Sequence, residues 1–231
     1  MKNIAVILAG GIGARVGGNV PKQLLPLADG RSVLEHATEA FEQAECIDEV
    51  CIVMHPDYIA FAEQALLRNG WQKVKHIIAG GKERWESSVN AIRLYESALS
   101  EEEFASANIL LHDAARPFVS QAIITNVCQT LKTHEAVTVA VPATDTMYVV
   151  DGEYVEKHVS AIPARDTFMR AQTPQAFRLP LIARAYALAL QDLALQATDD
   201  CGIVHRYLPM VQISIVHGEE TNKKITFKND L

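Results

Sequence analysis

A glycine-rich turn that follows a short apolar run near the N-terminus constrains the fold more than any other feature of this chain. The run covers residues 4–8, and all five are apolar. A run of this length and composition is typical of a central strand that is buried on both faces. The glycines that follow are Gly10, Gly11 and Gly13. Glycines let the main chain approach a phosphate closely, and the N–H groups of such a loop form an anion nest. With Arg15 and Lys22 close by, the segment predicts a triphosphate-binding turn at the end of a strand.

Two common phosphate-binding loops do not fit this segment. A Walker loop requires Gly-Lys followed by Ser or Thr, whereas Lys22 is preceded by Pro21 and followed by Gln23. A dinucleotide loop requires G-x-G-x-x-G, and here the third glycine, Gly17, comes one position late. An ordinary strand-to-helix turn would need glycine but explains neither the arginine nor the Pro-Lys-Gln triplet. The turn therefore indicates a different class of nucleotide site.

Length and composition exclude several other classes of protein. For 231 residues of which 49% are hydrophobic, one large α/β domain over residues 1–231 is the simplest prediction. The net charge of −7 argues against a broad nucleic-acid surface. No apolar run reaches membrane-spanning length, so we expect no membrane segment and a cytoplasmic protein. The four cysteines lack the spacing of metal ligands, and we expect them to be small buried or half-buried hydrophobic residues.

The order of the expected elements is strand, helix, strand, helix, which a doubly wound sheet requires. Strands are predicted at 4–8, 50–54, 74–78, 108–112, 137–141 and 211–216, and helices at 33–44, 58–69, 86–99 and 123–133. Thr198-Asp199-Asp200 is typical of a helix N-cap, with a supporting role near the site. The fold class that follows is α/β, with a doubly wound, mostly parallel, Rossmann-like sheet.

Residues 144–169 do not fit the alternation of strands and helices. Asp151-Gly152 lies between β-prone runs, which is a strong hairpin signal. A hairpin inserted into a parallel fold is either a flap or an arm that contacts a second subunit. The residues alone leave both possibilities open.

The residues that could carry chemistry fall in loops after separate predicted strands. In an open α/β sheet, ligands bind at the carboxyl ends of the strands. The positions concerned are Gly10 and Gly11, Gly80 and Gly81, Asp113 and Arg116, Asp145 and Thr146, and Lys224. Since parallel strands end at one edge of a sheet, these residues are expected to converge there.

Six motifs in one order identify a family. They are Leu-Ala-Gly-Gly-x-Gly-x-Arg from Leu8 followed by Pro21-Lys22-Gln23, then Gly80-Gly81-Lys82-Glu83-Arg84, His112-Asp113-Ala114-Ala115-Arg116-Pro117, Asp145-Thr146, Gln172-Thr173-Pro174-Gln175 and Lys223-Lys224-Ile225-Thr226. The first resembles the signature of sugar-nucleotide pyrophosphorylases. With Pro-Lys-Gln and the later motifs, the chain resembles the cytidylyltransferases that act on methylerythritol phosphate and on ribitol phosphate. The resemblance spans nearly the whole chain and implies the nucleotide-diphospho-sugar transferase type of sheet.

The resemblance implies a nucleotidyl transfer. A phosphate oxygen of the acceptor would attack the α-phosphorus of CTP, and pyrophosphate would leave. Because a phosphate monoester is already anionic, this chemistry needs positioning and charge neutralisation more than a base. We expect Arg15, Lys22 and Lys224 to stabilise the transition state. The divalent cation that the family implies is Mg²⁺, bridging phosphate oxygens, with Asp113 as its best, though weak, protein ligand.

The same resemblance implies the binding residues. Those expected at the nucleotide are Leu8, Ala9, Gly10, Gly11, Gly13, Gly81, Arg84, Ser87 and Asp113. Gly81 and Ser87 match positions near the cytosine, whereas Arg84 could hold the loop as easily as touch the ligand. Asp113 could bind an acceptor hydroxyl in place of the metal ion.

The residues expected at the acceptor are Asp113, Arg116, Thr146, Arg165 and Thr173. Arg165 and Thr173 resemble residues that bind the acceptor phosphate, and arginine suits phosphate through paired hydrogen bonds. For Arg165 the alternative is a salt bridge to Asp166. In the resembled family the β-arm exchanges with a second subunit, so we expect a homodimer whose pocket could be shared. His112 is expected to be structural.

The identity of the acceptor depends on finer details. Leu8-Ala9-Gly10-Gly11, Tyr148 where methylerythritol phosphate enzymes carry a basic residue, and the segment 162–166 resemble the ribitol 5-phosphate enzymes. Ala115 instead matches the methylerythritol group. We therefore expect D-ribitol 5-phosphate as acceptor and CDP-ribitol as product, with 2-C-methyl-D-erythritol 4-phosphate of isoprenoid biosynthesis as the alternative.

Two hypotheses that assign the chain to another class of protein stay open at this point. A CTP-binding domain without catalysis would not need Arg15, Lys22 and Lys224 together, and a hexose 1-phosphate nucleotidyltransferase would share only the N-terminal motif. The chain also ends where most relatives continue into a last helix. Either that helix is absent or the chain is one domain of a longer protein, for example one fused to a reductase.

Overall fold

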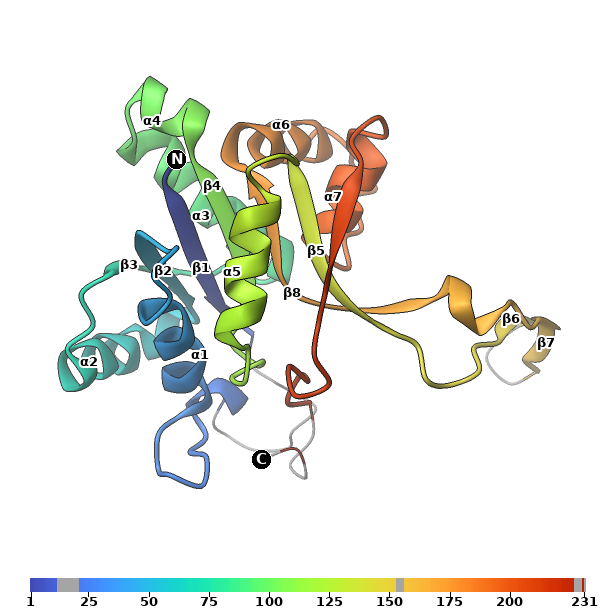
Figure 1. The fold of residues 1–231 in the computed structure, drawn as a ribbon, viewed down its shortest axis with the longest axis horizontal. Helices are drawn as coiled ribbons and strands as arrows, with labels where there is room; N and C mark the ends of the chain where they lie inside the picture. The colour runs from blue at the N-terminus through green and yellow to red at the C-terminus, as the bar shows by residue number, and fades with distance from the viewer. Residues whose placement is uncertain (12–20, 153–155, 227–229, 231) are drawn as a thin grey trace.

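Seven strands form the sheet on which the rest of the chain packs. The computed structural model describes residues 1–11, 21–152, 156–226 and 230. The strands are β1 (Asn3–Ala9), β2 (Glu49–Met54), β3 (Val74–Ala79), β4 (Asn108–Asp113), β5 (Ala136–Pro142), β8 (Met169–Arg178) and β9 (Ile213–His217). Their order across the sheet is β3-β2-β1-β4-β8-β5-β9 (Figure 1).

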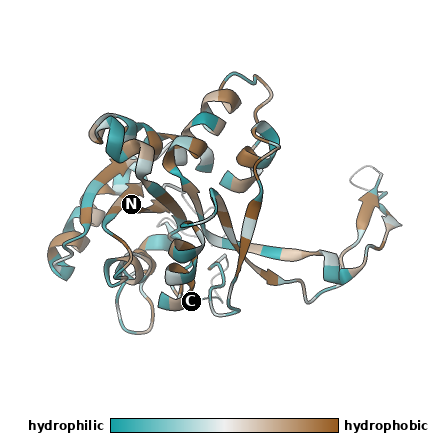
Figure 2. Cartoon of the chain, turned by 45° about the horizontal axis from the view of Figure 1, so that its top comes forward, coloured by the Kyte–Doolittle hydropathy of each residue, from teal (hydrophilic) through white to brown (hydrophobic). Residues whose placement is uncertain are grey.

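Helices cover both faces of this sheet and create two hydrophobic cores. On one face lie α1 (Val33–Glu42), α2 (Ile59–Asn69) and α5 (Gln121–Thr130). On the other lie α3 (Arg84–Ala98), α6 (Leu179–Ala189) and α7 (Asp200–Tyr207), with the short α4 (Glu101–Ser106) after α3. Figure 2 shows hydrophobic residues along the central strands between the two layers. The predicted doubly wound α/β architecture is confirmed.

The centre of the sheet is parallel, as its apolar strands predict. β1 pairs in parallel with β2 and with β4, and β2 pairs in parallel with β3. Every residue of β2 and β4 is buried, since helices cover both sides. The parallel strands therefore end at one edge of the sheet, where their loops meet.

One strand runs against this direction and was not predicted. β8 lies antiparallel between β4 and β5. Its sequence includes Gln172, Thr173 and Gln175, which are polar but buried, so it lacks the apolar signal of a central strand. The prediction of a mostly parallel sheet is confirmed, and β8 is its exception.

The helix ends follow local sequence rules. Ser32 and Glu35 form a reciprocal capping box at the start of α1, and such a cap stabilises a helix by about 1 kcal/mol. Gly70 ends α2 with a left-handed backbone conformation, φ +65°. The predicted N-cap before α7 is confirmed at Asp199, whose carboxylate accepts a hydrogen bond from the backbone N–H of Gly202 at 2.8 Å. α4 and α6 were not predicted.

The predicted hairpin forms an arm that projects from the body of the molecule (Figure 1). Its strands β6 (Val149–Asp151) and β7 (His158–Ala161) are antiparallel and form a separate two-stranded sheet. Asp151 pairs with His158, so Asp151-Gly152 does not form a two-residue turn between these strands. Residues 153–155, including Tyr154 and Val155, lie outside the described residues. The large apolar side chains exposed on the arm are Met147, Tyr148, Val149, Val150, Val159 and Ile162.

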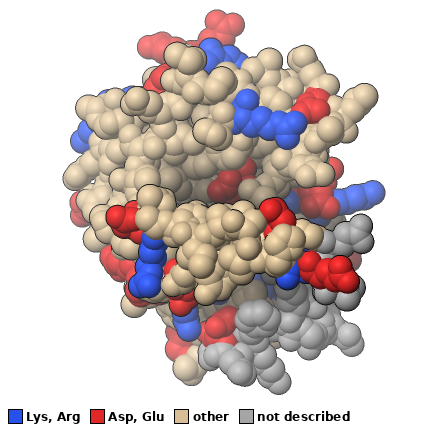
Figure 3. Space-filling model, turned by 90° about the vertical axis from the view of Figure 1, so that its right-hand side faces the viewer, with Lys and Arg blue, Asp and Glu red and all other residues tan. Residues whose placement is uncertain are grey.

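On the face from which the arm projects, the described residues form no continuous basic surface. Figure 3 shows this side with its Lys and Arg side chains in separate groups among acidic and uncharged residues. In the part of the chain that the structure describes, no helix is long and apolar enough to span a membrane.

Candidate functional site

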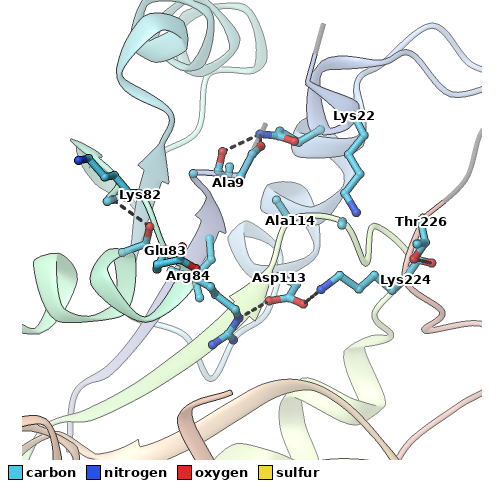
Figure 4. Close-up of a pocket in the computed structure, with 16 residues that line it drawn as sticks. Ala9, Lys22, Lys82, Glu83, Arg84, Asp113, Ala114, Lys224 and Thr226 are labelled. Atoms are coloured by element: carbon cyan, nitrogen blue, oxygen red, sulfur yellow. Dashed lines mark hydrogen bonds and ion pairs between the residues drawn. The ribbon is translucent and has the colours of Figure 1, made fainter. Parts of the chain in front are cut away.

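A cavity of about 320 Å³ opens at the carboxyl edge of the parallel strands. The end of β1 and the turn after it form one wall, and the loops after β3 and β4 form the next (Figure 4). The short helix η1 (Lys22–Leu24) and the segment after β9 close the remaining sides. The residues that line it are Leu8, Ala9, Gly10, Gly11, Lys22, Gln23, Gly81, Lys82, Glu83, Arg84, Ser87, Asp113, Ala114, Ala115, Lys224 and Thr226.

Ten of the predicted site residues are brought together in this cavity. They are Leu8, Ala9, Gly10, Gly11, Lys22, Gly81, Arg84, Ser87, Asp113 and Lys224. Gly13 and Arg15 lie outside the described residues. Arg116, Thr146, Arg165 and Thr173 do not line the cavity.

Two glycine turns meet at the side chain of Ser87. A Cβ atom on Gly10 or on Gly80 would lie 2.8 Å from Ser87 Oγ, so any other residue at either position would force the Ser87 side chain or the turn to shift. The Ser87 hydroxyl accepts a hydrogen bond from the backbone N–H of Gly81 at 3.1 Å. Its own hydrogen is thus directed away from that turn and can be donated to a ligand.

The carboxylate of Asp113 lies between two cationic side chains (Figure 4). Its Oδ1 lies 3.0 Å from Arg84 Nε, and its Oδ2 lies 2.7 Å from Lys224 Nζ. Burial alone would raise the pKa of Asp113, but the charges of Arg84 and Lys224 outweigh it and hold that pKa well below its usual value. Asp113 is therefore a carboxylate at any physiological pH.

A second buried carboxylate supports this arrangement from behind. Arg84 Nη1 lies 2.6 Å from Asp200 Oδ2, and Tyr186 donates its hydroxyl to Asp200 Oδ1 at 2.6 Å. Burial lowers the pKa of Arg84, but the carboxylates of Asp200 and Asp113 outweigh it and raise the pKa. The expected supporting role of the helix cap near residue 200 is thus carried by Asp200. Of the two roles open for Arg84, these contacts show it holding the loop, while its contact with a ligand stays a prediction.

The segment after β9 is anchored to the cavity rim by backbone contacts. Lys22 Nζ donates a hydrogen bond to the carbonyl oxygen of Ile225 at 2.7 Å, and Ile225 is fully buried. Arg116 donates to the carbonyl oxygen of Asn222 at 2.8 Å and to that of Ala171 at 3.1 Å. In this structure Arg116 therefore holds the segment that carries Lys224, and its role at an acceptor stays a prediction.

Thr173 supports the loop of Asp113 from β8. Its hydroxyl accepts a hydrogen bond from the backbone N–H of Asp113 at 3.2 Å and lies 3.0 Å from His112 Nδ1. His112 Nε2 lies 3.0 Å from the carbonyl oxygen of Arg116, which can only accept, so Nε2 carries the hydrogen and Nδ1 accepts from Thr173. Burial lowers the pKa of His112 to about 4. These contacts agree with the expected structural role of His112, and Thr173 uses its hydroxyl in the same network.

The two predicted residues of the arm lie together but away from the cavity of their own chain. Arg165 Nη2 lies 3.4 Å from Thr146 Oγ1, a long and weak contact between two exposed side chains. The arm projects from the body (Figure 1), so these groups do not reach the cavity lined by the same chain.

The described residues offer no preformed magnesium site. No group of three His, Cys, Asp or Glu side chains within them could hold a metal ion. Asp113, the proposed ligand, already has a cationic partner on each carboxylate oxygen. Direct coordination of a metal ion by Asp113 would require Arg84 or Lys224 to move. The described side chains therefore suit a cation that arrives bound to phosphate better than an ion that the protein holds by itself.

Gln23 is one of six described residues that line the cavity without a role assigned from the sequence; the others are Lys82, Glu83, Ala114, Ala115 and Thr226. Gln23 belongs to the Pro-Lys-Gln motif, so the sequence marked its position. The role of a glutamine amide depends on the groups to which it hydrogen-bonds, and the sequence does not show these. Here its side chain is buried and donates to two backbone carbonyls of the glycine turn.

The arrangement is suited to holding a large anion. Among the described residues, four basic side chains line the cavity, namely Lys22, Lys82, Arg84 and Lys224, against two acidic ones, Glu83 and Asp113. Lys22 and Lys224 reach the same opening from different segments of the chain (Figure 4), while Lys82 points away from it. With the glycine turn between them, the cavity can neutralise charge that develops on a bound phosphate chain.

Comparison with known proteins gives a consistent result. The family profile described as IspD, 2-C-methyl-D-erythritol 4-phosphate cytidylyltransferase, matches residues 3–231. A 2-C-methyl-D-erythritol 4-phosphate cytidylyltransferase from Thermobifida fusca is 44% identical over 98% of this chain and 89% of its own. The bifunctional ribulose 5-phosphate reductase/CDP-ribitol pyrophosphorylase Bcs1 of Haemophilus influenzae is 39% identical over all of this chain but only 47% of its own. The crystal structure of a 4-diphosphocytidyl-2C-methyl-D-erythritol synthase from Anaerococcus prevotii superposes with a TM-score of 0.82 at 27% identity, covering 99% and 92% of the two chains.

Proposed function

The chain belongs to the 2-C-methyl-D-erythritol 4-phosphate cytidylyltransferase (IspD) family, and on this premise we propose that it transfers CMP from CTP to 2-C-methyl-D-erythritol 4-phosphate. The observation that carries the proposal is the convergence of Lys22, Lys224 and the glycine turn on one cavity. A phosphate oxygen of the acceptor attacks the α-phosphorus of CTP. A new P–O bond forms, the bond from the α-phosphorus to the bridging oxygen breaks, and pyrophosphate leaves.

The basic side chains supply what this reaction needs. Negative charge grows on the oxygens of the α-phosphate and on the leaving pyrophosphate, and preorganised cations stabilise it more in the transition state than in the ground state. Lys22 and Lys224 reach the opening from two sides, so that the phosphate chain lies between them (Figure 4). Arg15, which follows the turn, is the third predicted cation. Mg²⁺ enters as MgCTP, bound to phosphate oxygens as part of the substrate.

The cytosine would bind where the two glycine turns meet. Ser87 accepts from Gly81 and keeps its own hydrogen for the ligand. Cytosine presents two acceptors, N3 and O2, on the edge that such a donor would read. The close approach of Gly10 and Gly80 leaves no side chain between this edge and the backbone.

The binding site for the acceptor would be completed by a second subunit. Arg165 and Thr146 lie on an arm that does not reach its own cavity, although both are expected at the acceptor and Arg165 resembles a residue that binds its phosphate. The exposed apolar side chains of the arm, among them Val150, Val159 and Ile162, give a reason for this arm to pack against another chain. We therefore include a homodimer with exchanged arms, and a cytoplasmic location, in the proposal.

The relatives reverse the order of acceptors expected from the sequence details. The family profile and the Thermobifida relative carry the name of the methylerythritol phosphate enzyme, whereas the Haemophilus relative joins a CDP-ribitol activity to a reductase. The details that favoured ribitol phosphate, such as Tyr148, lie largely on the exposed arm and on the N-terminal motif. Ribitol 5-phosphate remains the second candidate, supported by those residues and by 39% identity.

The test is pyrophosphate release from MgCTP with each acceptor in parallel. We expect turnover with methylerythritol phosphate. The kcat/KM for ribitol phosphate should be at least about tenfold lower than that for methylerythritol phosphate. A preference for ribitol 5-phosphate would restore the acceptor expected from the sequence. CTP binding without turnover on either acceptor would reject the proposed activity.

A further inference from the structure

The side chain of Gln23 joins the glycine turn to the helix that carries Lys22. Gln23 is 3% exposed, and its amide nitrogen lies 2.7 Å from the carbonyl oxygen of Ala9 and 2.6 Å from that of Gly11. A carboxamide has two N–H donors, so one side chain accounts for both bonds. The contacts cross 14 and 12 positions of the sequence.

Fixing these carbonyls also fixes the direction of backbone N–H groups. In a trans peptide the N–H points opposite to the C=O of the same unit. The carbonyl of Ala9 and the N–H of Gly10 belong to one peptide, so the bond from Gln23 orients the Gly10 N–H. Glycine peptides rotate more easily than others, and a turn built from them needs an external anchor to present its donors in one direction.

The same bonds set the place of a cation. Lys22 and Gln23 are neighbours in the one-turn helix η1, whose C-terminal residue Leu24 donates its N–H to the carbonyl of Pro21 at 2.9 Å. While Gln23 holds the glycine turn, Lys22 extends to the carbonyl of Ile225 on the opposite wall of the cavity. A shift of η1 would therefore move Lys22 and release the turn together.

We propose that Gln23 is a positioning residue for the triphosphate, which acts by locking the glycine turn and Lys22 into one anion-binding unit. The inference rests on the proposed function, because it takes CTP as the ligand of the cavity. It assigns to Gln23 no contact with the reacting atoms.

A merely structural role would have a different signature. Buried carbonyls need donors, and Gln23 could serve only to satisfy those of Ala9 and Gly11. Loss of the Gln23 side chain would then lower the stability of the fold and weaken the binding of all cytidine nucleotides alike. A positioning role predicts a loss of affinity that grows with the number of phosphates, because Lys22 faces the phosphate chain and not the base.

The experiment compares CTP and CMP binding in the full-length protein. Gln23→Met keeps the length of the side chain and removes both donors, and Gln23→Glu places a charge against the same carbonyls. Gln43→Met is the matched control, since Gln43 is exposed and donates only to Glu39 on its own helix. Dissociation constants come from calorimetry, and thermal unfolding reports the fold of each variant.

The expected result is that Gln23→Met raises the dissociation constant for CTP by roughly tenfold or more, while that for CMP changes by less than about threefold. In turnover, the KM for CTP should rise and that for the acceptor should stay. Unchanged CTP affinity, or equal losses for CTP and CMP, would overturn the positioning role while leaving the proposed activity intact. Wild-type protein that bound no CTP would instead reject the proposed function, and this inference with it.

Discussion

Asp113 and Lys224 form an ion pair of 2.7 Å across the cavity, although 111 positions of the sequence separate them. The pair joins the carboxyl end of β4 to the segment after β9. The family resemblance assigns Lys224 to catalysis. A bound acceptor or phosphate could replace the Asp113 carboxylate as the partner of this cation. The ion pair thus holds Lys224 by the same charge that the reaction would use.

Lys22→Ala is expected to lower kcat by about 10²- to 10³-fold, because it removes one preorganised cation from the leaving pyrophosphate. Thermal unfolding should change by only a few degrees, since the side chain is half-buried at the cavity rim. Lys75→Ala, at an exposed position of β3, is the control. Pyrophosphate release at saturating substrates measures the effect, and a wild-type rate would remove Lys22 from the mechanism.

Asp113→Asn should destabilise the fold by about 2 kcal/mol at neutral pH, because Arg84 and Lys224 lose their shared anion while Lys224 remains partly solvated. The folded pKa of Asp113 is lowered, so its stabilising contribution is present above the unfolded pKa of about 4 and is lost as pH falls toward the folded pKa.

Urea unfolding of wild type and Asp113→Asn across pH measures this difference. The gap in unfolding free energy should be constant from pH 6 to 8 and should narrow below about pH 4. Asp57→Asn, whose side chain is 81% exposed, is the control and should show no such gap. A gap that persisted unchanged at pH 2 would contradict the ion-pair assignment.

Arg165→Ala should raise the KM for the acceptor by roughly tenfold or more while the KM for CTP changes by less than about twofold, because arginine binds phosphate through paired hydrogen bonds. Steady-state kinetics with each substrate varied in turn gives both values. Arg184→Ala removes an exposed arginine from α6 and should leave both constants unchanged. The opposite pattern, a larger effect on CTP, would reject the assignment of Arg165.

Mixing two impaired variants, at an acceptor concentration well below the KM of Arg165→Ala, tests whether the arm acts in the partner's cavity. In exchanged dimers of Lys22→Ala and Arg165→Ala subunits, one of the two cavities contains neither substitution. Random reassociation should then recover up to about a quarter of wild-type activity, since half of the dimers are mixed and half of their sites are intact. Activity equal to the mean of the two separate variants would show that the arm serves its own chain.

Much of the site could be predicted because its parts are local patterns. The glycines after β1, the Pro-Lys-Gln triplet and Asp113 each follow a recognisable strand, and the carboxyl ends of parallel strands meet by topology. Thr173, Arg116 and Asp200 show the limit of this reasoning. Their partners are backbone or side-chain groups far away in the sequence, so no spacing could show that Thr173 supports Asp113 or that Arg116 holds Asn222.

By itself, the sequence determined the alternation of strands and helices, the phosphate-binding turn and the family, since these depend on residue types at short spacing. Only the tertiary structure decided the antiparallel insertion of β8, the anchoring of the turn by Gln23 and the separation of Arg165 from its own cavity. Each of these depends on which distant groups the fold brings within hydrogen-bond distance. Such contacts arise from the packing of whole elements, which neighbouring residues do not encode.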